Sequence, residues 1–310
     1  MEDKIFDTVV IGGGPAGYSA ALYCARAGMK TAVLEMLSAG GQMTLTETIE
    51  NYPGFNEGVD GFTLGDQMQQ QAEKFGAETF LTEVTGMDLD GFDKTVHTAD
   101  EGDFHTHAVI IATGANARQI QFPESEKYQD RGIHYCAACD GMRFRGKTVA
   151  LNGGGNTALE DALYLSRICE KVYLIHRRQQ YRAEQFYVDG VSKTENIEPV
   201  LDSVVDGALL ENGKWAGVRV KNVKTGETRD LPSEALFVSI GRVPNTKMVP
   251  ESVERDKGGY LIADETTCTN VPGVFAVGDV RTKPLRQVIT AAADGAVASV
   301  FALKYIESQK

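Results

Sequence analysis

Two cysteines, Cys136 and Cys139, are separated by two alanines and followed directly by Asp140. Thiol–disulfide exchange needs a thiolate that attacks and a leaving thiol that can be protonated. A carboxyl group next to the pair can do acid–base work on that step. The sequence therefore predicts a redox-active dithiol, with Cys136, Cys139 and Asp140 as its catalytic residues.

The alternative chemistry for a Cys-x-x-Cys pair is half of a zinc site. The chain contains no second pair of this kind and no suitably spaced pair of histidines. His134, two residues before Cys136, leaves one mixed site open, but we expect no metal. Cys24 and Cys169 fall within expected helices and are predicted to be core residues, and Cys268 has no assigned role.

The first glycine-rich turn, at residues 12–17, lies between an apolar strand expected at 5–11 and a helix expected at 15–26. A second strand at 31–34 ends at Glu35, about 20 residues past the first glycine. The glycines allow close backbone approach to a pyrophosphate, and the helix N-terminus supplies free N–H groups. Because Glu35 can accept hydrogen bonds from ribose hydroxyls, these residues predict a dinucleotide-binding unit.

A second unit of the same kind follows the dithiol. A strand at 147–151 leads into the glycines of 153–158, and a helix at 158–168 precedes a strand at 172–175. The position that reads the ribose carries cationic residues and no acid. They are His176, Arg177, Arg178 and Arg182. A cationic cluster suits a 2′-phosphate, so the sequence favours NADP over NAD.

The remaining elements follow from periodicity and turn signals. Helices are expected at about 61–75 and 291–305. Strands are expected near 78–84, at 94–98 and 104–108 as a hairpin, at 108–114, at 204–210 and 215–220 in a meander, and at 235–240. The last strand, which ends at Gly278 and Asp279, would complete the sheet of the first unit.

The length of 310 residues favours two domains, or one domain interrupted by another. Polar connectors at 116–132 and 241–245 mark the boundaries. We therefore predict an α/β chain with two Rossmann-like (three-layer ββα) dinucleotide-binding domains, the second inserted in the first. The expected bounds are 1–115, 116–245 and 246–310, and the two connectors would form a hinge.

The formal net charge of -12 argues against a nucleic acid or an anionic membrane as partner, because both require clustered lysine and arginine. The charged N-terminus lacks the pattern of a signal peptide. No apolar run approaches the roughly 20 residues of a membrane-spanning helix. We expect a cytoplasmic protein without a membrane partner.

Taken together, the motifs resemble the low-molecular-weight thioredoxin reductases, a class II pyridine nucleotide-disulfide oxidoreductase family. The matching segments run from end to end in the same order. They are residues 12–17, 40–42, 51–54, 112–114, 136–141, 153–158, 176–178, 182–184, 241–245, 278–279 and 286–287. Each short motif is shared by many flavoproteins, but their order and spacing, with the dithiol in the second domain, are much more specific.

This resemblance implies an enzyme that passes electrons from NADPH through FAD to a Cys136–Cys139 disulfide and then to thioredoxin. Cys139 would face the flavin, Cys136 would attack the partner, and Asp140 would protonate the leaving thiolate. A homodimer is also implied. The residues implied for FAD are Gly12, Gly14, Pro15, Ala16, Glu35, Gly41, Gln42, Asn51, Val84, Ala112, Thr113, Gly114, Asp279, Arg286, Gln287 and Val288. Those implied for NADPH are Gly153, Gly155, Asn156, Thr157, His176, Arg177, Arg178, Arg182, Ile240 and Gly241.

The chain departs from the family pattern beside the dithiol. Met142 and Arg143 stand where the family usually has two aromatic residues that receive thioredoxin, and Asn152 replaces an apolar residue. The partner could therefore be thioredoxin or a thioredoxin-like protein of its own shape and charge. Alternatives are a glutaredoxin- or peroxiredoxin-type partner, a donor such as ferredoxin, or a redox-sensing module without turnover.

Overall fold

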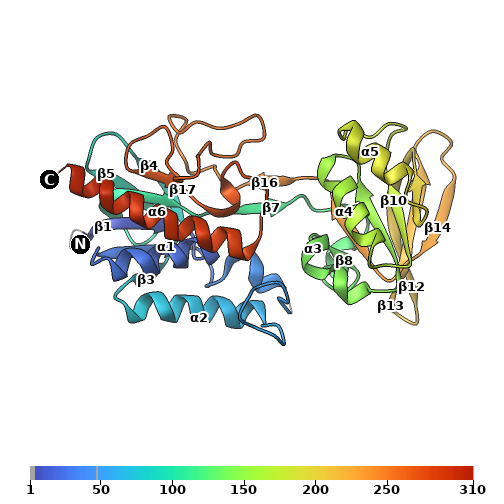
Figure 1. Ribbon diagram of the computed structural model, residues 1–310, viewed down its shortest axis with the longest axis horizontal. Coiled ribbons are helices and arrows are strands. Elements are labelled where there is room, and N and C mark those ends of the chain that lie inside the picture. The colour runs from blue at the N-terminus through green and yellow to red at the C-terminus, as the bar shows by residue number, and fades with distance from the viewer. Residues whose placement is uncertain (1–3, 47, 310) are drawn as a thin grey trace. The chain divides into compact units, whose positions relative to one another are not determined.

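The computed structural model describes residues 4–46 and 48–309. The chain divides into two compact units, Met1–Asn116 with Val243–Lys310, and Ala117–Arg242. Where the chain passes between them, β7 (Ala115–Ala117) and β16 (Arg242–Pro244) pair as a two-stranded sheet. Each unit carries its own sheet and core (Figure 1), which confirms the predicted α/β class.

The sheet of the first unit has the order β3-β2-β1-β6-β5-β4, and β17 also pairs with β6. Strands β3, β2, β1, β6 and β17 are parallel neighbours, while β5 and β4 are antiparallel. The strands are β1 (Lys4–Ile11), β2 (Thr31–Glu35), β3 (Glu78–Leu81), β4 (Val84–Asp88), β5 (Lys94–Thr98), β6 (Asp103–Ile111) and β17 (Val274–Ala276). The carboxyl ends of β1 and β2 therefore meet at one edge, which places the first glycine turn beside Glu35.

Helices α1 (Pro15–Arg26) and α6 (Val288–Ser308) pack against each other in the first unit (Figure 1). Their approach is close, because a Cβ on Gly295 would lie 2.2 Å from the Ala16 carbonyl oxygen. The other helix of this unit is α2 (Gly61–Lys74), which begins with Asp60 as its cap. Two apolar clusters cover the sheet, one with Val10 and Ala298, the other with Phe6 and Phe104.

The length of α6 corrects one expectation. We expected no apolar run long enough for a spanning helix, but among the described residues α6 is long and apolar enough by composition. Its packing against α1 gives it a different role, because Ala298 and Ala302 are completely buried in the core of the unit. A core helix that is apolar on much of its surface passes the same test of length and composition.

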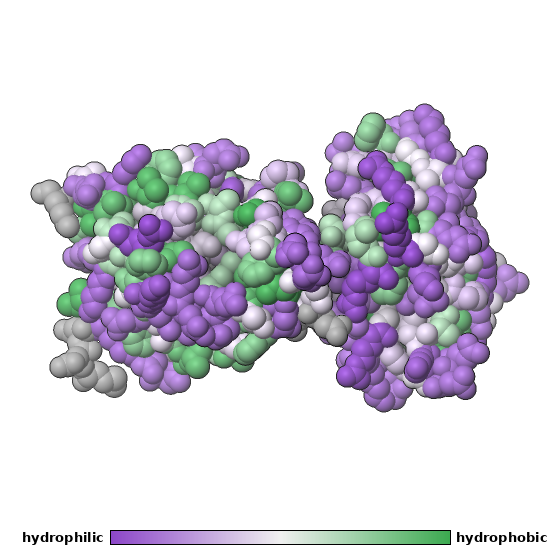
Figure 2. Space-filling view, turned by 60° about the horizontal axis from the view of Figure 1, so that its bottom comes forward, coloured by the Kyte–Doolittle hydropathy of each residue, from purple (hydrophilic) through white to green (hydrophobic). Residues whose placement is uncertain are grey.

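The second unit is built on a parallel sheet with the order β11-β10-β9-β15-β8, flanked by an antiparallel sheet β12-β13-β14. The strands are β8 (Ile133–His134), β9 (Thr148–Gly153), β10 (Lys171–Ile175), β11 (Ile197–Val200), β12 (Ser203–Glu211), β13 (Lys214–Asn222), β14 (Thr228–Pro232) and β15 (Leu236–Ser239). The helices are α3 (Ala137–Asp140), α4 (Asn156–Ser166) and α5 (Gln185–Ser192). Hydrophilic side chains cover much of the visible surface of both units (Figure 2).

Several boundaries differ from those expected. The hairpin arm and the buried strand predicted separately at 104–108 and 108–114 are one strand, β6. Its first half pairs with β5 and its second half with β17. The alternating pattern of the hairpin arm and the continuous apolar pattern of the buried strand therefore belong to one strand. Cys24 is a buried residue of α1 as predicted. Cys169 is buried but lies beyond the end of α4, and Cys268 is partly exposed.

Candidate functional site

Cys136 and Cys139 form a disulfide at the start of α3, with their Cα atoms 5.3 Å apart. Cys136 is the residue that caps the helix. Its Sγ accepts a hydrogen bond of 3.2 Å from the backbone N–H of Cys139. A donor aimed at this sulfur favours a thiolate on Cys136 when the bond is reduced.

Asp140 directly follows Cys139 in the sequence, and its carboxylate is buried. It contacts the side chains of His134 and Arg143. Its Oδ2 lies 3.3 Å from Nδ1 of His134, and its Oδ1 lies 3.9 Å from Nη1 of Arg143. Within residues 4–46 and 48–309, no group of three or more His, Cys, Asp and Glu could hold a metal ion. The contact of His134 is therefore with the carboxylate that sequence reasoning assigned to acid–base chemistry.

The first glycine turn lies between β1 and α1, and Glu35 reaches it from the end of β2. The carboxylate of Glu35 accepts a hydrogen bond of 2.6 Å from the backbone N–H of Gly13. A Cβ on Gly14 would meet no atom within 4 Å, so the backbone before α1 is open to a ligand. The open turn, the helix N-terminus and the carboxylate match what the pyrophosphate and ribose of a dinucleotide require.

Other residues predicted for the same site are joined by side-chain contacts. Gln42 donates to Asn116 at 2.7 Å, and Asn116 donates to Asn245 at 3.1 Å. Asn51 donates to Gln287 at 3.1 Å, and Gln287 also caps α6. These contacts link four chain segments of the first unit that are far apart in the sequence.

The rest of the predicted set lies on or beside the same elements. Pro15 and Ala16 begin α1, Val84 begins β4, and Val288 begins α6. Ala112, Thr113 and Gly114 follow β6, Gly41 and Gln42 lie in a short 3-10 helix, and Asp279 lies in another. Arg286 lies 4.2 Å from the ring centroid of Tyr260, and its Nε is 3.5 Å from the Asp279 carbonyl oxygen.

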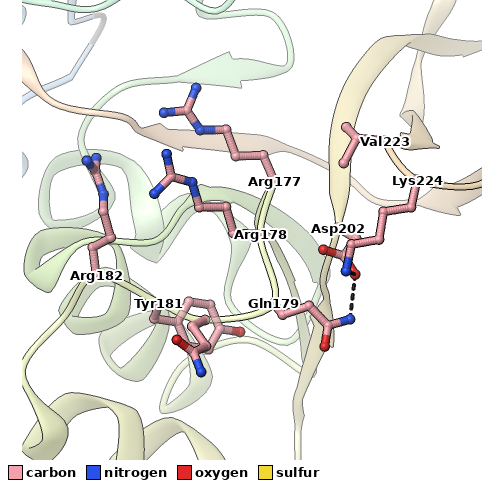
Figure 3. A pocket seen from close by; sticks show the side chains of 9 residues that line it. Arg177, Arg178, Gln179, Tyr181, Arg182, Asp202, Val223 and Lys224 are labelled. Carbon is pink, nitrogen blue, oxygen red and sulfur yellow. Dashed lines mark hydrogen bonds and ion pairs between the residues drawn. The ribbon is translucent and has the colours of Figure 1, made fainter.

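In the second unit, a pocket of about 460 Å³ lies beyond the end of β10 (Figure 3). Arg177, Arg178 and Arg182 lie on one side of it, and Asp202, Val223 and Lys224 lie on the other. The backbone N–H of Arg182 donates to the Gly154 carbonyl at 2.7 Å, which ties the arginine segment to the glycine turn. A cluster of exposed guanidinium groups at this position can bind a phosphate.

The opposite wall of the pocket contains residues that the sequence reasoning did not identify. Asp202 accepts a hydrogen bond of 2.5 Å from Gln179, and the Lys224 ammonium lies 2.9 Å from the same carboxylate (Figure 3). These two contacts lower the pKa of Asp202 and keep it ionised. Because Lys224 comes from the turn after β13, only the folded meander brings it to the arginines.

His176 and Asn156 have structural contacts of their own. A Cβ on Gly154 would lie 2.1 Å from Nδ1 of His176, and the other ring nitrogen lies 3.1 Å from the Gln180 carbonyl oxygen. Burial lowers the pKa of His176, and the neighbouring arginines act in the same direction. Asn156 exchanges two hydrogen bonds with Glu184, at 2.9 and 2.8 Å.

Gly153, Gly155 and Thr157 surround the same turn, where a Cβ on Gly155 would meet no atom within 4 Å. Ile240 and Gly241 follow the end of β15. The second unit therefore repeats the open glycine turn of the first. It differs in carrying arginines where the first unit has Glu35.

Comparisons with known proteins agree with this arrangement. The family described as pyridine nucleotide-disulphide oxidoreductase matches residues 6–295. The thioredoxin reductase of Treponema pallidum is 40% identical over 304 residues, covering 98% of both chains. That of Streptomyces coelicolor is 42% identical over 303 residues, covering 97% of this chain and 94% of the relative. The crystal structure of thioredoxin reductase from Streptococcus pyogenes, 39% identical, covers 99% of this chain and 100% of its own, with a TM-score of 0.92.

Proposed function

The chain belongs to the pyridine nucleotide-disulphide oxidoreductase family, and we propose that it is an NADPH-dependent thioredoxin reductase. In this proposal, electrons pass from NADPH through FAD to the Cys136–Cys139 disulfide and then to the disulfide of thioredoxin or a thioredoxin-like protein. The observation that carries it is a Cys-x-x-Cys disulfide in the same unit as an arginine-lined pocket and an open glycine turn. The full-length thioredoxin reductase relatives support the same reading.

The first unit fits FAD. The backbone at Gly14 is open, and Glu35 stands at the turn where a ribose would lie. Flavin chemistry, when the cofactor is bound, consists of accepting a hydride and delivering two electrons to a disulfide. The residues of this unit would hold the cofactor by backbone N–H groups and by the linked amides of Gln42, Asn51 and Gln287.

The arginine pocket supports NADPH as the donor. Arg177, Arg178 and Arg182 would bind the 2′-phosphate that distinguishes NADPH from NADH. Asp202, paired with Gln179 and Lys224, is held on the opposite wall. A donor such as ferredoxin has no use for this pocket, so the geometry favours NADPH over that alternative.

The two thiols take different parts in the exchange. Once the disulfide is reduced, the thiolate of Cys136 attacks the partner's disulfide, forms a mixed disulfide and releases one partner sulfur. Cys139 then attacks the Cys136 sulfur, which restores the enzyme disulfide and releases the second partner sulfur. Each released thiolate takes a proton, and Asp140 is the group placed to supply one. The N–H of Cys139 supports Cys136 as the attacker.

For the partner protein we propose only a class, and the oligomeric state and the cellular location are expectations from the sequence. Met142 is exposed and Arg143 contacts Asp140, so the surface beside the thiols lacks the two aromatic residues expected in the family. The partner is proposed to be a thioredoxin or a thioredoxin-like protein whose docking surface suits these residues. A homodimer, implied by the resemblance, and a cytoplasmic location, expected from the N-terminal sequence and the lack of a long apolar run, stay predictions.

The test is a spectrum followed by a turnover assay. The purified full-length protein should be yellow, should bleach anaerobically with NADPH, and should reduce oxidised bacterial thioredoxin with NADPH far faster than with NADH or reduced ferredoxin. Absence of flavin absorbance, or bleaching by NADPH without reduction of any thioredoxin, would contradict the proposal.

A further inference from the structure

We propose that His134 is a positioning residue for disulfide exchange. Its Nδ1 lies 3.3 Å from Oδ2 of Asp140 and holds that carboxyl group in one orientation. This inference rests on the proposed function, because it assigns a role in the exchange between Cys136–Cys139 and a partner disulfide. The sequence offered His134 only as one conceivable metal ligand, and the structure gives its ring a different partner.

The geometry holds both groups in fixed positions. His134 is 1% exposed and Asp140 is 7% exposed, so neither has ready access to bulk water. His134 is the second residue of β8 and pairs with Phe237 of β15, which fixes its backbone in the parallel sheet. Its ring centroid lies 5.1 Å from that of Phe144 and 5.5 Å from that of Phe237. Two aromatic rings and a strand therefore direct Nδ1 at the carboxylate.

Ionisable groups from three nearby segments surround His134. The described ionisable groups that face it are Asp130, before β8, Asp140 on α3 and Arg143 on the following turn. Asp130 interacts electrostatically with His134, Asp140 and Arg143, and also with Tyr135. Asp130, Asp140, Arg143 and His134 therefore form one cluster in which two acids face two basic groups. A buried cluster with a balanced charge costs less desolvation energy than an unbalanced one.

Asp130 shows that this cluster responds to charge. Burial raises its pKa, Asp140 raises it further, and the positive charges of His134 and Arg143 act against that rise. Any change in the charge of His134 is therefore felt by both carboxylates. The imidazole thus interacts with both acids that lie closest in sequence to the thiols.

The consequence for the exchange concerns one proton. When the Cys136 thiolate forms a bond to a partner sulfur, the other partner sulfur leaves with the electron pair of the broken bond and needs a proton. Asp140 can supply it only if its carboxyl group is held in the right direction and can be reprotonated. His134 serves both needs, because Nδ1 fixes the carboxyl group and a protonated ring can return a proton to it.

Two substitutions separate position from charge. His134→Asn keeps an amide donor near the place of Nδ1 but cannot be protonated, whereas His134→Phe fills the space between the aromatic rings and removes the donor. His97→Asn is the matched control, because His97 also contacts two carboxylates, Asp88 and Asp103, but lies in β5 of the first unit. All variants are prepared as full-length holoenzymes.

Two rates are measured from about pH 5.5 to about pH 9. One is flavin bleaching by NADPH, and the other is single-turnover reduction of oxidised bacterial thioredoxin by the pre-reduced enzyme. His134→Phe should lower the second rate roughly 10- to 100-fold and leave the first unchanged. His134→Asn should keep most of the rate, because its amide still holds the carboxyl group, but its pH profile should differ from that of the wild type, because an amide cannot exchange a proton with Asp140.

The outcomes are distinguishable. If the wild type bleaches but reduces no thioredoxin, the proposed function fails and takes this inference with it. If the wild type is active and the His134→Asn profile superimposes on that of the wild type and of His97→Asn, only the inference is overturned. Parallel loss of both rates would also overturn it, because it would show a purely structural role. Should His134→Phe fail to fold, the His134→Asn profile decides.

Discussion

The Ser239 hydroxyl donates a hydrogen bond of 2.5 Å to the Asp161 carboxylate and so joins the end of β15 to α4. Burial raises the pKa of Asp161 from its ordinary value of 3.8 to about 6, although Ser239 acts in the opposite direction. This pair lies beside the second glycine turn, since a Cβ on Gly153 would lie 2.5 Å from the Ser239 carbonyl oxygen. Stability of the second unit should therefore depend on pH through this carboxyl group.

Asp161→Asn should remove that dependence. A group whose pKa is raised on folding stabilises the fold fully below its unfolded value, and the contribution is lost as the pH rises through about 6. The variant should therefore be more stable than the wild type by about 1 to 3 kcal/mol near pH 8, and the difference should shrink toward pH 4. Urea unfolding at the two pH values measures this. The exposed Asp206, changed to Asn, is the control, and a difference independent of pH would contradict the assignment.

Asp294→Asn should destabilise the first unit. The Asp294 carboxylate accepts hydrogen bonds from Arg281 at 2.9 and 3.0 Å, from Lys283 at 2.7 Å and from the Gly278 N–H at 2.9 Å. The substitution removes the carboxylate that pairs with both of these nearly buried cations, which should cost about 3 to 5 kcal/mol. Because Gly278 precedes Asp279, the variant should also retain less FAD. The flavin-to-protein absorbance ratio and urea unfolding check both effects, with the exposed Asp93→Asn expected to match the wild type.

Arginine substitutions in the pocket should act on NADPH and spare NADH. Arg177→Ala, Arg178→Ala and Arg182→Ala each remove a charged donor, worth about 1.5 to 3 kcal/mol, from a phosphate. The KM for NADPH should rise roughly 10- to 100-fold, while kcat/KM for NADH should change little. Arg219→Ala removes an exposed arginine paired with Asp230 in the same unit and is the control. Equal losses with both nucleotides would show that these arginines do not read the 2′-phosphate.

The two cysteines should be separable by trapping. Cys139→Ser should retain flavin bleaching by NADPH and lose turnover with thioredoxin. Its remaining Cys136 should also form a mixed disulfide with a single-cysteine thioredoxin activated as its thionitrobenzoate disulfide. Cys136→Ser should react at a rate lower by a factor of roughly 10 or more, because the Cys139 N–H supports a thiolate only on Cys136. Release of thionitrobenzoate measures the rate, and faster trapping by Cys136→Ser would reverse the assignment.

Local signals were sufficient for elements whose ends are marked in the sequence. Helix α1 runs from Pro15 to Arg26 as predicted, since a proline suits the first helical position and Gly28 follows the end. Helix α5 was not predicted, because its start depends on Asn156, which binds the backbone N–H of Glu184 from another helix. A cap supplied by a distant residue leaves no pattern in the local sequence.

The candidate site was predictable to a similar extent. The thiols, Asp140 and the arginine cluster follow from residue type and spacing. The contact of His134 with Asp140 does not, because it depends on β8 pairing with β15, much later in the chain. Lys224 likewise reaches the pocket only because the meander folds over the end of β10. Spacing identifies reactive groups, whereas the side chains that surround them come from tertiary pairing.

The residues after Asp140 should decide how well the enzyme receives a thioredoxin. Met142 is 45% exposed, and Arg143 places its guanidinium 3.9 Å from the Asp140 carboxylate. Met142→Phe changes only the exposed surface, whereas Arg143→Phe also removes a charge that faces Asp140. If these residues set the partner, each substitution should change kcat/KM for a bacterial thioredoxin by about 10-fold or more, as expected when an interface anchor is altered. Flavin bleaching by NADPH should stay constant.

A matched control is Arg167→Phe, an exposed arginine at the end of α4 in the same unit. Steady-state reduction of thioredoxins from several bacteria would measure the preference directly. Two results together would contradict this prediction. The wild type would reduce a thioredoxin from a distant source with ordinary efficiency, and Arg143→Phe and Met142→Phe would behave like Arg167→Phe. Other residues would then determine which partner the enzyme reduces. An effect confined to Arg143→Phe and to its pH profile would instead assign Arg143 to the Asp140 cluster, because only that residue shares its charge with the carboxylate.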